Sequence, residues 1–186
     1  MIDGSVTVSV ALAALALLAY ASGAGQLMRI VQPEPRWLTA TIDDGAYPIV
    51  IQVRPALPLG AKRSHYPHLL TVRWDYRPQS DLFPFPEEHK LMAAFEDVLS
   101  TTLRRPRVGF LMAVVTGNGK QEWLCYGRDL GEATAAIQGE LAQAKSVSAR
   151  ISSRRDPDWS EHEMLRQSVE GRTEAQGQSP GLLPVF

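Results

Sequence analysis

Short stretches of apolar and polar residues follow one another quickly between residues 32 and 168. Alternation is clearest at 69–76, where every second residue is apolar, as expected of a strand that buries one face. Residues 108–115 are almost continuously apolar, which predicts a central strand covered on both faces. The predicted strands are 37–42, 47–53, 69–76, 108–115, 120–128 and 147–151.

Apolar residues at helical spacing predict two helices between these strands. The first begins at Pro86, where Glu87 and Glu88 complement the helix dipole, and carries a stripe that includes Leu91 and Phe95. The second covers about 130–144. A third, short and poorly apolar helix is predicted from Asp156-Pro157, taken as an N-cap and first residue, to about Arg166.

The order of these elements predicts an α+β fold. Residues 116–119 (Thr-Gly-Asn-Gly) are a strong hairpin signal between two strands. The core then follows the order strand–helix–strand–strand–helix–strand, which favours a ferredoxin-like sandwich: an antiparallel sheet with two helices on one face, plus one or two extra N-terminal strands. The predicted domain spans 32–168, and the Gln-, Gly- and Ser-containing segment 171–186 is expected to be a disordered tail.

The first 28 residues form an apolar leading segment. Residues 4–28 contain no charged side chain, and their apolar centre is 6–21. Ala19-Tyr20-Ala21 matches a signal-peptide cleavage site, which predicts export to the periplasm or secretion. The same residues, retained, would make a single-pass membrane anchor, with residues 6–21 as the membrane contact. If translation starts at Met28, the protein is cytoplasmic.

Composition narrows the function classes. The 186 residues include 19 basic and 20 acidic side chains, a net charge of −1, which disfavours a generally basic nucleic-acid-binding protein. One cysteine, Cys125, excludes an intrachain disulfide and a multi-thiolate metal site. The four histidines form no ligand pattern, so no metal is expected. No nucleophile elbow or phosphate-binding glycine loop is present, so no cofactor and no catalytic residue is predicted.

Acidic residues gather at predicted turns and strand ends. Carboxylates at Glu122, Asp129 and Asp156, near Tyr126 and Arg128, could do acid–base work, which would suit a hydrolase. Aspartate also favours turns and helix caps for hydrogen-bonding reasons alone, and this structural interpretation is preferred.

Aromatic residues are numerous for a small domain and include all four tryptophans. On an uncovered sheet face, aromatic side chains can stack RNA bases. Basic residues do not interleave them as such modules require, so core packing or contact with a protein partner is favoured.

Landmarks spread along the chain resemble the bacterial family of unknown function DUF695. They are Trp37 with Asp43-Asp44-Gly45, Tyr66-Pro67, Pro84 or Pro86 with Glu87, Thr116, Gly119, Glu122-Trp123, Tyr126, Asp129 and Asp156-Pro157-Asp158-Trp159. The resemblance implies no established activity and no catalytic residues. Some members are fused to a domain similar to a ribonuclease E inhibitor, which implies a regulatory or protein-binding role by analogy.

The preferred hypothesis is therefore a non-enzymatic binding or regulatory module that recognises a protein partner. The alternatives are the hydrolase described above and a cytoplasmic regulator of RNA processing that starts at Met28. The candidate binding residues are Trp37, Tyr66, Trp74, Glu122, Tyr126, Arg128, Asp156 and Trp159.

Overall fold

The structure, a computed structural model, describes residues 37–175 apart from 44–46, 59, 81, 106–107 and 144–148. The predicted leading segment 1–28 lies outside this range. The strands are β1 (Leu38–Asp43), β2 (Pro48–Val53), β3 (His68–Asp75), β4 (Gly109–Gly117), β5 (Lys120–Gly127) and β6 (Ala149–Arg155). The helices are α2 (Pro86–Leu103), α3 (Leu130–Gln143) and α4 (Ser160–Ala175), with a short 3-10 helix η1 (Arg63–His65).

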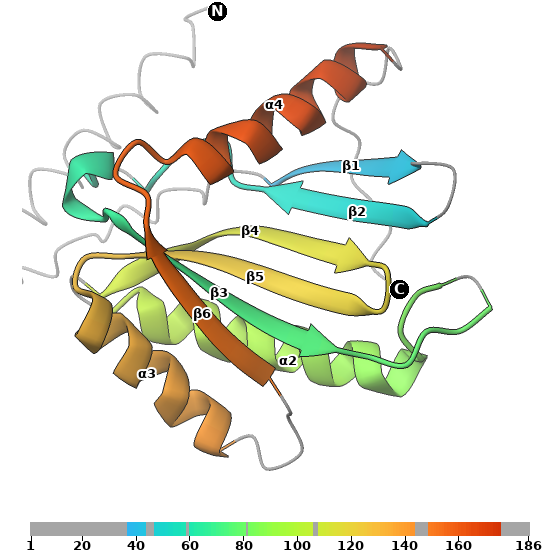
Figure 1. Cartoon of the computed structure of the whole chain (residues 1–186), viewed down its shortest axis with the longest axis horizontal. Coiled ribbons are helices and arrows are strands. Elements are labelled where there is room, and N and C mark those ends of the chain that lie inside the picture. The colour runs from blue at the N-terminus through green and yellow to red at the C-terminus, as the bar shows by residue number, and fades with distance from the viewer. Residues whose placement is uncertain are drawn as a thin grey trace, which may run out of the picture. The chain divides into compact units, whose positions relative to one another are not determined.

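The six strands form one sheet in the order β1-β2-β4-β5-β3-β6, and every neighbouring pair is antiparallel (Figure 1). The predicted hairpin joins β4 to β5 through Asn118 and Gly119, whose φ angles of 51° and 70° suit this turn. The prediction of an α+β fold with an antiparallel sheet and two added N-terminal strands, β1 and β2, is confirmed.

Helices α2 and α3 pack on one face of the sheet and fill the larger core. Alternate residues of β3 and β5, among them Leu70, Val72 and Trp123, point into this core and meet Phe95 and Leu99 of α2. Burial of such apolar side chains contributes about 1.5–3 kcal/mol each. Only part of the predicted stripe lies on the face of α2 that the sheet covers: Phe95 is buried there, whereas Leu91 is 52% exposed, because the buried face runs through Met92 and Leu99 instead.

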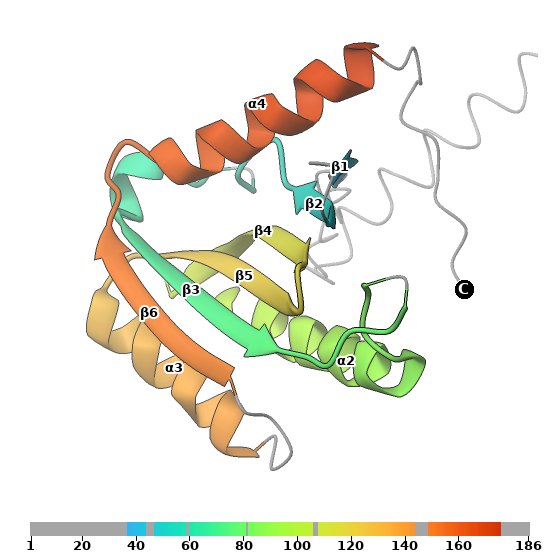
Figure 2. The same ribbon diagram turned by 45° about the vertical axis from the view of Figure 1, so that its right-hand side comes forward.

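Helix α4, whose position relative to the sheet the sequence did not predict, packs on the opposite face (Figure 2). The buried residues of α4 and the turn before it are Trp159, His162, Leu165 and Val169, at spacings of three and four. They pack over β1, β2 and β4. This stripe buries the apolar residues that β1 and β2 present on that face.

Three predicted boundaries near the C-terminus are wrong. The last strand is Ala149–Arg155, four polar residues longer at its end than the apolar pattern indicated, because an edge strand needs few apolar residues. The last helix begins at Ser160 rather than at Pro157, and it runs to Ala175 rather than to about Arg166. Residues 171–175, assigned to the tail, are thus helical, and 176–186 lie outside the described residues.

Within the described part of the chain, none of the helices combines the length and the apolar character that a bilayer crossing requires.

Candidate functional site

The face of the sheet that carries α4 is only half covered. Helix α4 lies mainly over β1, β2 and β4, and among the described helices none covers the same face of β5, β3 and β6 beside it (Figure 2). The strand register identifies the side chains that lie on this open half, which we call the open face. They are Lys120, Glu122 and Leu124 of β5, Leu69, Thr71, Arg73 and Asp75 of β3, and Arg150, Ser152 and Arg154 of β6.

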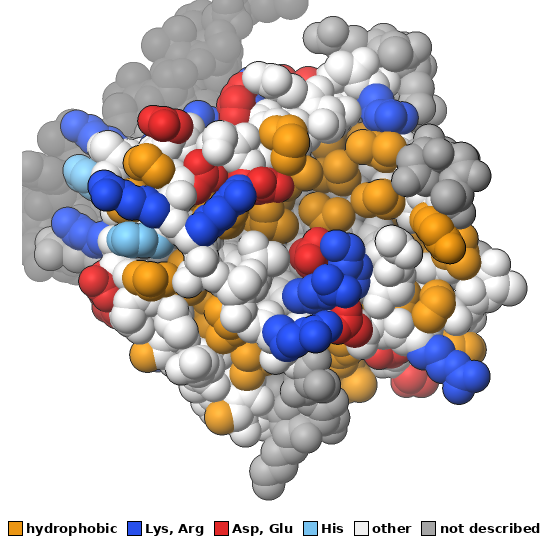
Figure 3. Space-filling model, in the orientation of Figure 1, with side chains coloured by type: hydrophobic (Ala, Val, Ile, Leu, Met, Phe, Trp, Pro, Cys, Tyr) orange, Lys and Arg blue, Asp and Glu red, His pale blue; other side chains and the backbone are white. Residues whose placement is uncertain are grey.

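A groove of about 500 Å³ runs along the open face between α4 and β6. Its floor is apolar and its rim is polar: the lining residues are Leu69, Thr71, Val115, Glu122, Leu124, Ser152, Ser153, Arg154, Glu161 and Leu165. In Figure 3 an apolar hollow below α4 is bordered by charged side chains of both signs. An apolar floor with a polar border is typical of a binding surface.

Ion pairs border the groove and continue along the open face. Lys120 Nζ lies 3.0 Å from Glu122 Oε2, and Arg154 lies 2.5 Å from Glu161 of α4. Asp75 accepts hydrogen bonds from both Arg73 and Arg150. The bond from Arg73, followed by the effects of Arg150, lowers the pKa of the Asp75 carboxyl, so Asp75 stays ionised between the two guanidinium groups.

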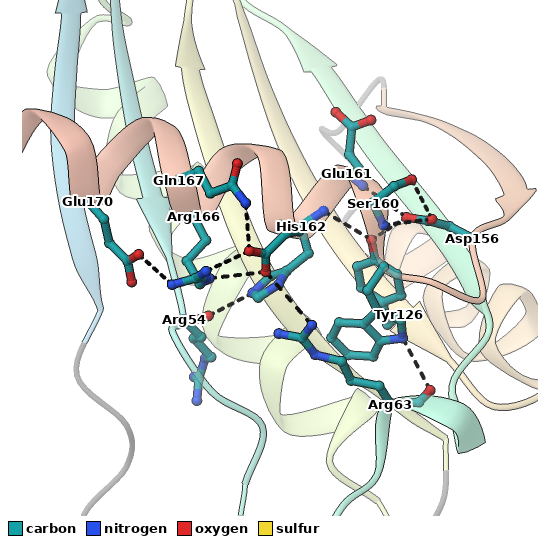
Figure 4. Close-up of polar contacts among 12 residues, drawn as sticks. Arg54, Arg63, Tyr126, Asp156, Ser160, Glu161, His162, Arg166, Gln167 and Glu170 are labelled. Atoms are coloured by element: carbon teal, nitrogen blue, oxygen red, sulfur yellow. Dashed lines mark hydrogen bonds and ion pairs between the residues drawn. The ribbon is translucent and has the colours of Figure 1, made fainter.

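A buried polar cluster, which we call the α4 joint, fixes the helix that forms the upper wall of the groove (Figure 4). The hydroxyl of Tyr126 donates to Oδ2 of Asp156 at 2.6 Å and accepts from the backbone N–H of His162 at 3.2 Å. Oδ1 of Asp156 accepts from the N–H and the hydroxyl of Ser160 at 2.9 and 2.8 Å. Asp156 therefore caps the N-terminus of α4 from the turn that precedes the helix.

The electrostatics of the joint keep Asp156 ionised and Tyr126 neutral. Burial raises the pKa of Asp156, but the hydrogen bonds donated by Tyr126 and Ser160 outweigh burial and leave the pKa below its usual value. Burial and the bond to Asp156 raise the pKa of Tyr126. Since Tyr126 is fully buried and Asp156 is 5% exposed, this pair serves structure rather than proton exchange with a ligand.

Trp159 completes the joint. Its ring stacks on Tyr126 with centroids 3.8 Å apart, and its φ of 59° turns the chain sharply before the helix. Its indole Nε1 donates to the backbone carbonyls of Tyr66 at 3.0 Å and Arg63 at 3.2 Å. The tryptophan thereby connects η1 to the start of α4.

His162 is 1% exposed and neutral within the same joint. Its Nε2 lies 2.8 Å from the carbonyl of Arg54, so Nε2 carries the proton, and its buried Nδ1 finds no hydrogen-bond partner in the described part of the chain. Burial lowers the pKa of this imidazole, because a charged ring would lose its hydration.

The structure brings together four of the eight candidate binding residues, all in the α4 joint: Tyr66, Tyr126, Asp156 and Trp159. They are buried, so we expect them to influence a ligand only by holding α4, the upper wall of the groove, in position. Of the eight candidate binding residues, Glu122 is the one that lines the groove.

The other three lie elsewhere. The indole of Trp74 bonds to Glu88 in the α2 core, Trp37 lies under the guanidinium of Arg54 at 4.7 Å, and Arg128 is exposed after β5.

The carboxylates considered for a hydrolase do not converge. Glu122 lines the groove four residues before Tyr126, about 13 Å along the strand. Exposed Asp129 caps α3 through the N–H of Glu132 at 2.8 Å, and Asp156 caps α4. Cys125 is fully buried, and burial raises the pKa of its thiol. Among the residues that the structure describes, no cluster of metal-ligating side chains is found.

Sequence reasoning missed His162 and the charged rows of the open face. The spacing of Trp159, His162 and Leu165 could have revealed the buried side of α4, since three-residue steps are helical. Arg73 and Arg150 could be associated only after the register of β3 with β6 was known.

Comparison with known proteins gives one match. The model of a family described as a family of unknown function, DUF695, matches residues 36–165. Neither the curated proteins nor the solved structures include a significant match to the chain.

Proposed function

The chain belongs to the DUF695 family, and we propose that its domain is a non-enzymatic binding module for a protein partner. The observation that carries this proposal is the open face, where an apolar floor lies beside a fixed helix and is bordered by ion pairs. An apolar centre with a charged border suits a protein surface that excludes water at its middle.

The charges on the open face favour an acidic partner segment. Four basic side chains, Lys120, Arg73, Arg150 and Arg154, surround three acidic ones, Asp75, Glu122 and Glu161. The side chains of Arg150 and Arg154 are 72% and 55% exposed, more than their carboxylate partners. The cationic groups thus form the outermost layer, which acidic side chains of a partner would contact first.

The placement of the reactive groups supports a role without catalysis. The carboxylates of Asp129 and Asp156 are engaged as helix caps, and the thiol of Cys125 is enclosed in the core. Glu122 reaches the groove, but it is paired with Lys120.

We place the module outside the cytoplasm or at a membrane, carried there by residues 1–28 as a cleaved signal or as an anchor. Sequencing the N-terminus of the native protein tests this: a new terminus after Ala21 indicates export, an intact Met1 in the membrane fraction indicates an anchor, and a terminus at Met28 overturns both.

The framework of this module is, in our proposal, ferredoxin-like. The order β3-α2-β4-β5-α3-β6 along the chain, the strand order β4-β5-β3-β6 and the location of α2 and α3 on one face support this assignment.

Site-specific crosslinking tests the binding surface. A photoreactive amino acid replaces Thr71 or Ser152 of the open face, or Lys90 of α2 as a matched control, in cells that produce the full chain. We expect the two open-face positions, and not Lys90, to crosslink the same protein. That protein, once purified, should bind the wild-type chain and bind an Arg73→Glu, Arg150→Glu variant about tenfold more weakly. Equal crosslinking from Lys90, or equal affinity of the partner for the wild-type chain and the charge-reversed variant, would overturn the proposal.

A further inference from the structure

Strand β6 forms one edge of the sheet and pairs only with β3 among the described strands (Figures 1 and 2). The direction of its backbone groups follows from the register. The N–H of Asp156 donates to the carbonyl of Pro67, so this pair is hydrogen-bonded, and every second pair before it is hydrogen-bonded too. Arg150, Ser152 and Arg154 therefore bond to β3.

The remaining residues of β6 turn their backbone groups away from the sheet. These are Ala149, Ile151, Ser153 and Arg155. The bond from the N–H of Tyr76 to the carbonyl of Gly119 supports this alternation of hydrogen-bonded pairs. It shows that the even-numbered residues of β3 bond to β5, so the odd-numbered residues bond to β6. The outer edge of β6 thus presents a row of backbone donors and acceptors.

The side chains of β6 differ between its two faces. Arg150 and Arg154 lie on the open face, whereas Ala149 and Ile151 lie on the other face, partly buried against the core under α2 and α3. A strand added beside β6 would alternate in the same way. Acidic side chains suit the positions beside the two arginines, and apolar side chains suit those beside Ala149 and Ile151.

We propose that β6 is a docking edge for an extended segment of the protein partner, which pairs antiparallel with residues 149–155 and places acidic side chains opposite Arg150 and Arg154. This inference rests on the proposed function and specifies how the partner binds. Main-chain hydrogen bonds supply affinity, and the alternation of acidic and apolar side chains supplies specificity.

A second copy of this chain fits the edge poorly. Two antiparallel β6 strands centred on Ser152 would place Arg150 of each opposite Arg154 of the other, and like charges facing each other are destabilising. The same arginines therefore oppose self-pairing and favour an acidic segment.

Synthetic heptapeptides test the edge directly. The probe is Thr-Glu-Val-Thr-Val-Glu-Val, which in the antiparallel register places its glutamates opposite Arg154 and Arg150, and the matched control carries lysine in place of both glutamates. Added to the isotope-labelled full chain, the probe is expected to slow amide hydrogen exchange at Ile151 and Ser153, and to bind about tenfold more tightly than the lysine control.

N-methylation separates strand pairing from simple charge attraction. In this register the amides of peptide positions 3 and 5 point toward β6, and those of positions 4 and 6 point away. Methylation at 3 and 5 should weaken binding about tenfold, and methylation at 4 and 6 should have little effect. Equal effects of the two methylated peptides would overturn strand pairing.

A variant of the chain gives an independent test. Ser153→Pro removes an N–H that points away from β3, so the sheet should remain folded while probe binding falls about tenfold. Lys90→Glu, an exposed site on α2, is the control and should leave binding unchanged.

The outcomes also separate this inference from the proposed function. If the purified partner binds Ser153→Pro as tightly as wild type, docking at β6 is wrong and the open-face proposal stands. If the partner also binds independently of charge reversal on the open face, both proposals fall.

Discussion

The hydroxyl of Tyr126 on β5 and the carboxylate of Asp156, thirty residues later, form a 2.6 Å hydrogen bond that is enclosed beneath the start of α4. Because Tyr126 also accepts from the N–H of His162, the bond links a central strand to the first turn of the helix. The pair therefore determines where the upper wall of the groove lies.

Removing either member of this pair should loosen α4. Tyr126→Phe leaves the N–H of His162 without its acceptor, and we expect the free energy of unfolding to fall by about 1–3 kcal/mol. Asp156→Ala removes the cap as well and should cost at least as much. Urea unfolding of both variants and of the double variant measures the coupling.

Asp158→Ala, two residues away and exposed, is the control and should change stability by less than about 0.5 kcal/mol. If the effects of Tyr126→Phe and Asp156→Ala simply add in the double variant, the two groups do not act as one unit.

The sequence predicted the strands well because burial of one face produces a period-two pattern that can be seen locally. Leu70, Val72 and Trp74 alternate with polar residues, and all three are buried in the structure. The end of β6 could not be predicted in this way, since Ser152–Arg155 are exposed at an edge and carry no apolar signal.

The candidate site was harder to predict because its residues meet only in three dimensions. Tyr126 and Asp156 were grouped as possible parts of an acid–base site, but nothing in their spacing indicates a hydrogen bond between β5 and the turn before α4. Asp156 was correctly interpreted as a cap signal, although the helix begins at Ser160. The extent of the open face depends on how much of the sheet α4 covers, and this is a property of tertiary packing.

Protonation of His162 should destabilise the fold in mild acid. The unfolded chain takes up this proton near pH 6.5, whereas burial lowers the pKa in the folded chain. The folded state thus binds fewer protons, and stability that is present above about pH 6.5 is lost as the pH falls toward the folded-state pKa. Over this range the free energy of unfolding should fall by at most about 1.4 kcal/mol per pH unit. Urea unfolding between pH 7.5 and 4.5 measures it.

The surroundings of His162 cannot easily accommodate the added charge. The charges of Arg63 and Arg166 lower the pKa of the ring further, and Glu163, which raises it, is already engaged by Arg166. In His162→Gln the amide can still donate to the carbonyl of Arg54, so the variant should fold and lose this part of the pH dependence. His89→Gln, on the exposed start of α2, should keep it; an unchanged slope in His162→Gln would contradict the assignment.

Adjacent residues of α2 should differ strongly in their response to truncation. Leu99 is completely buried in the core under the sheet, and Leu99→Ala should lower the free energy of unfolding by about 2–5 kcal/mol through lost burial and the cavity left behind. Val98, 44% exposed on the same helix, is the control, and Val98→Ala should stay within about 0.5 kcal/mol of wild type. Equal losses in thermal or urea unfolding would mean that α2 packs with a different face.

Two glycines test how closely α3 approaches the sheet, because the same substitution should have opposite signs at them. A Cβ at Gly127, where β5 ends, would lie 2.7 Å from the Cβ of Ala133 in α3 and 3.1 Å from Leu70. Gly127→Ala must therefore displace the helix, and we expect a loss of about 1–3 kcal/mol. A Cβ at Gly139, inside α3, meets nothing within 4 Å, so Gly139→Ala should stabilise the protein by about 0.5–1 kcal/mol through helix propensity. Urea unfolding of both variants measures the difference, and a neutral Gly127→Ala would show that α3 does not pack this tightly against β5.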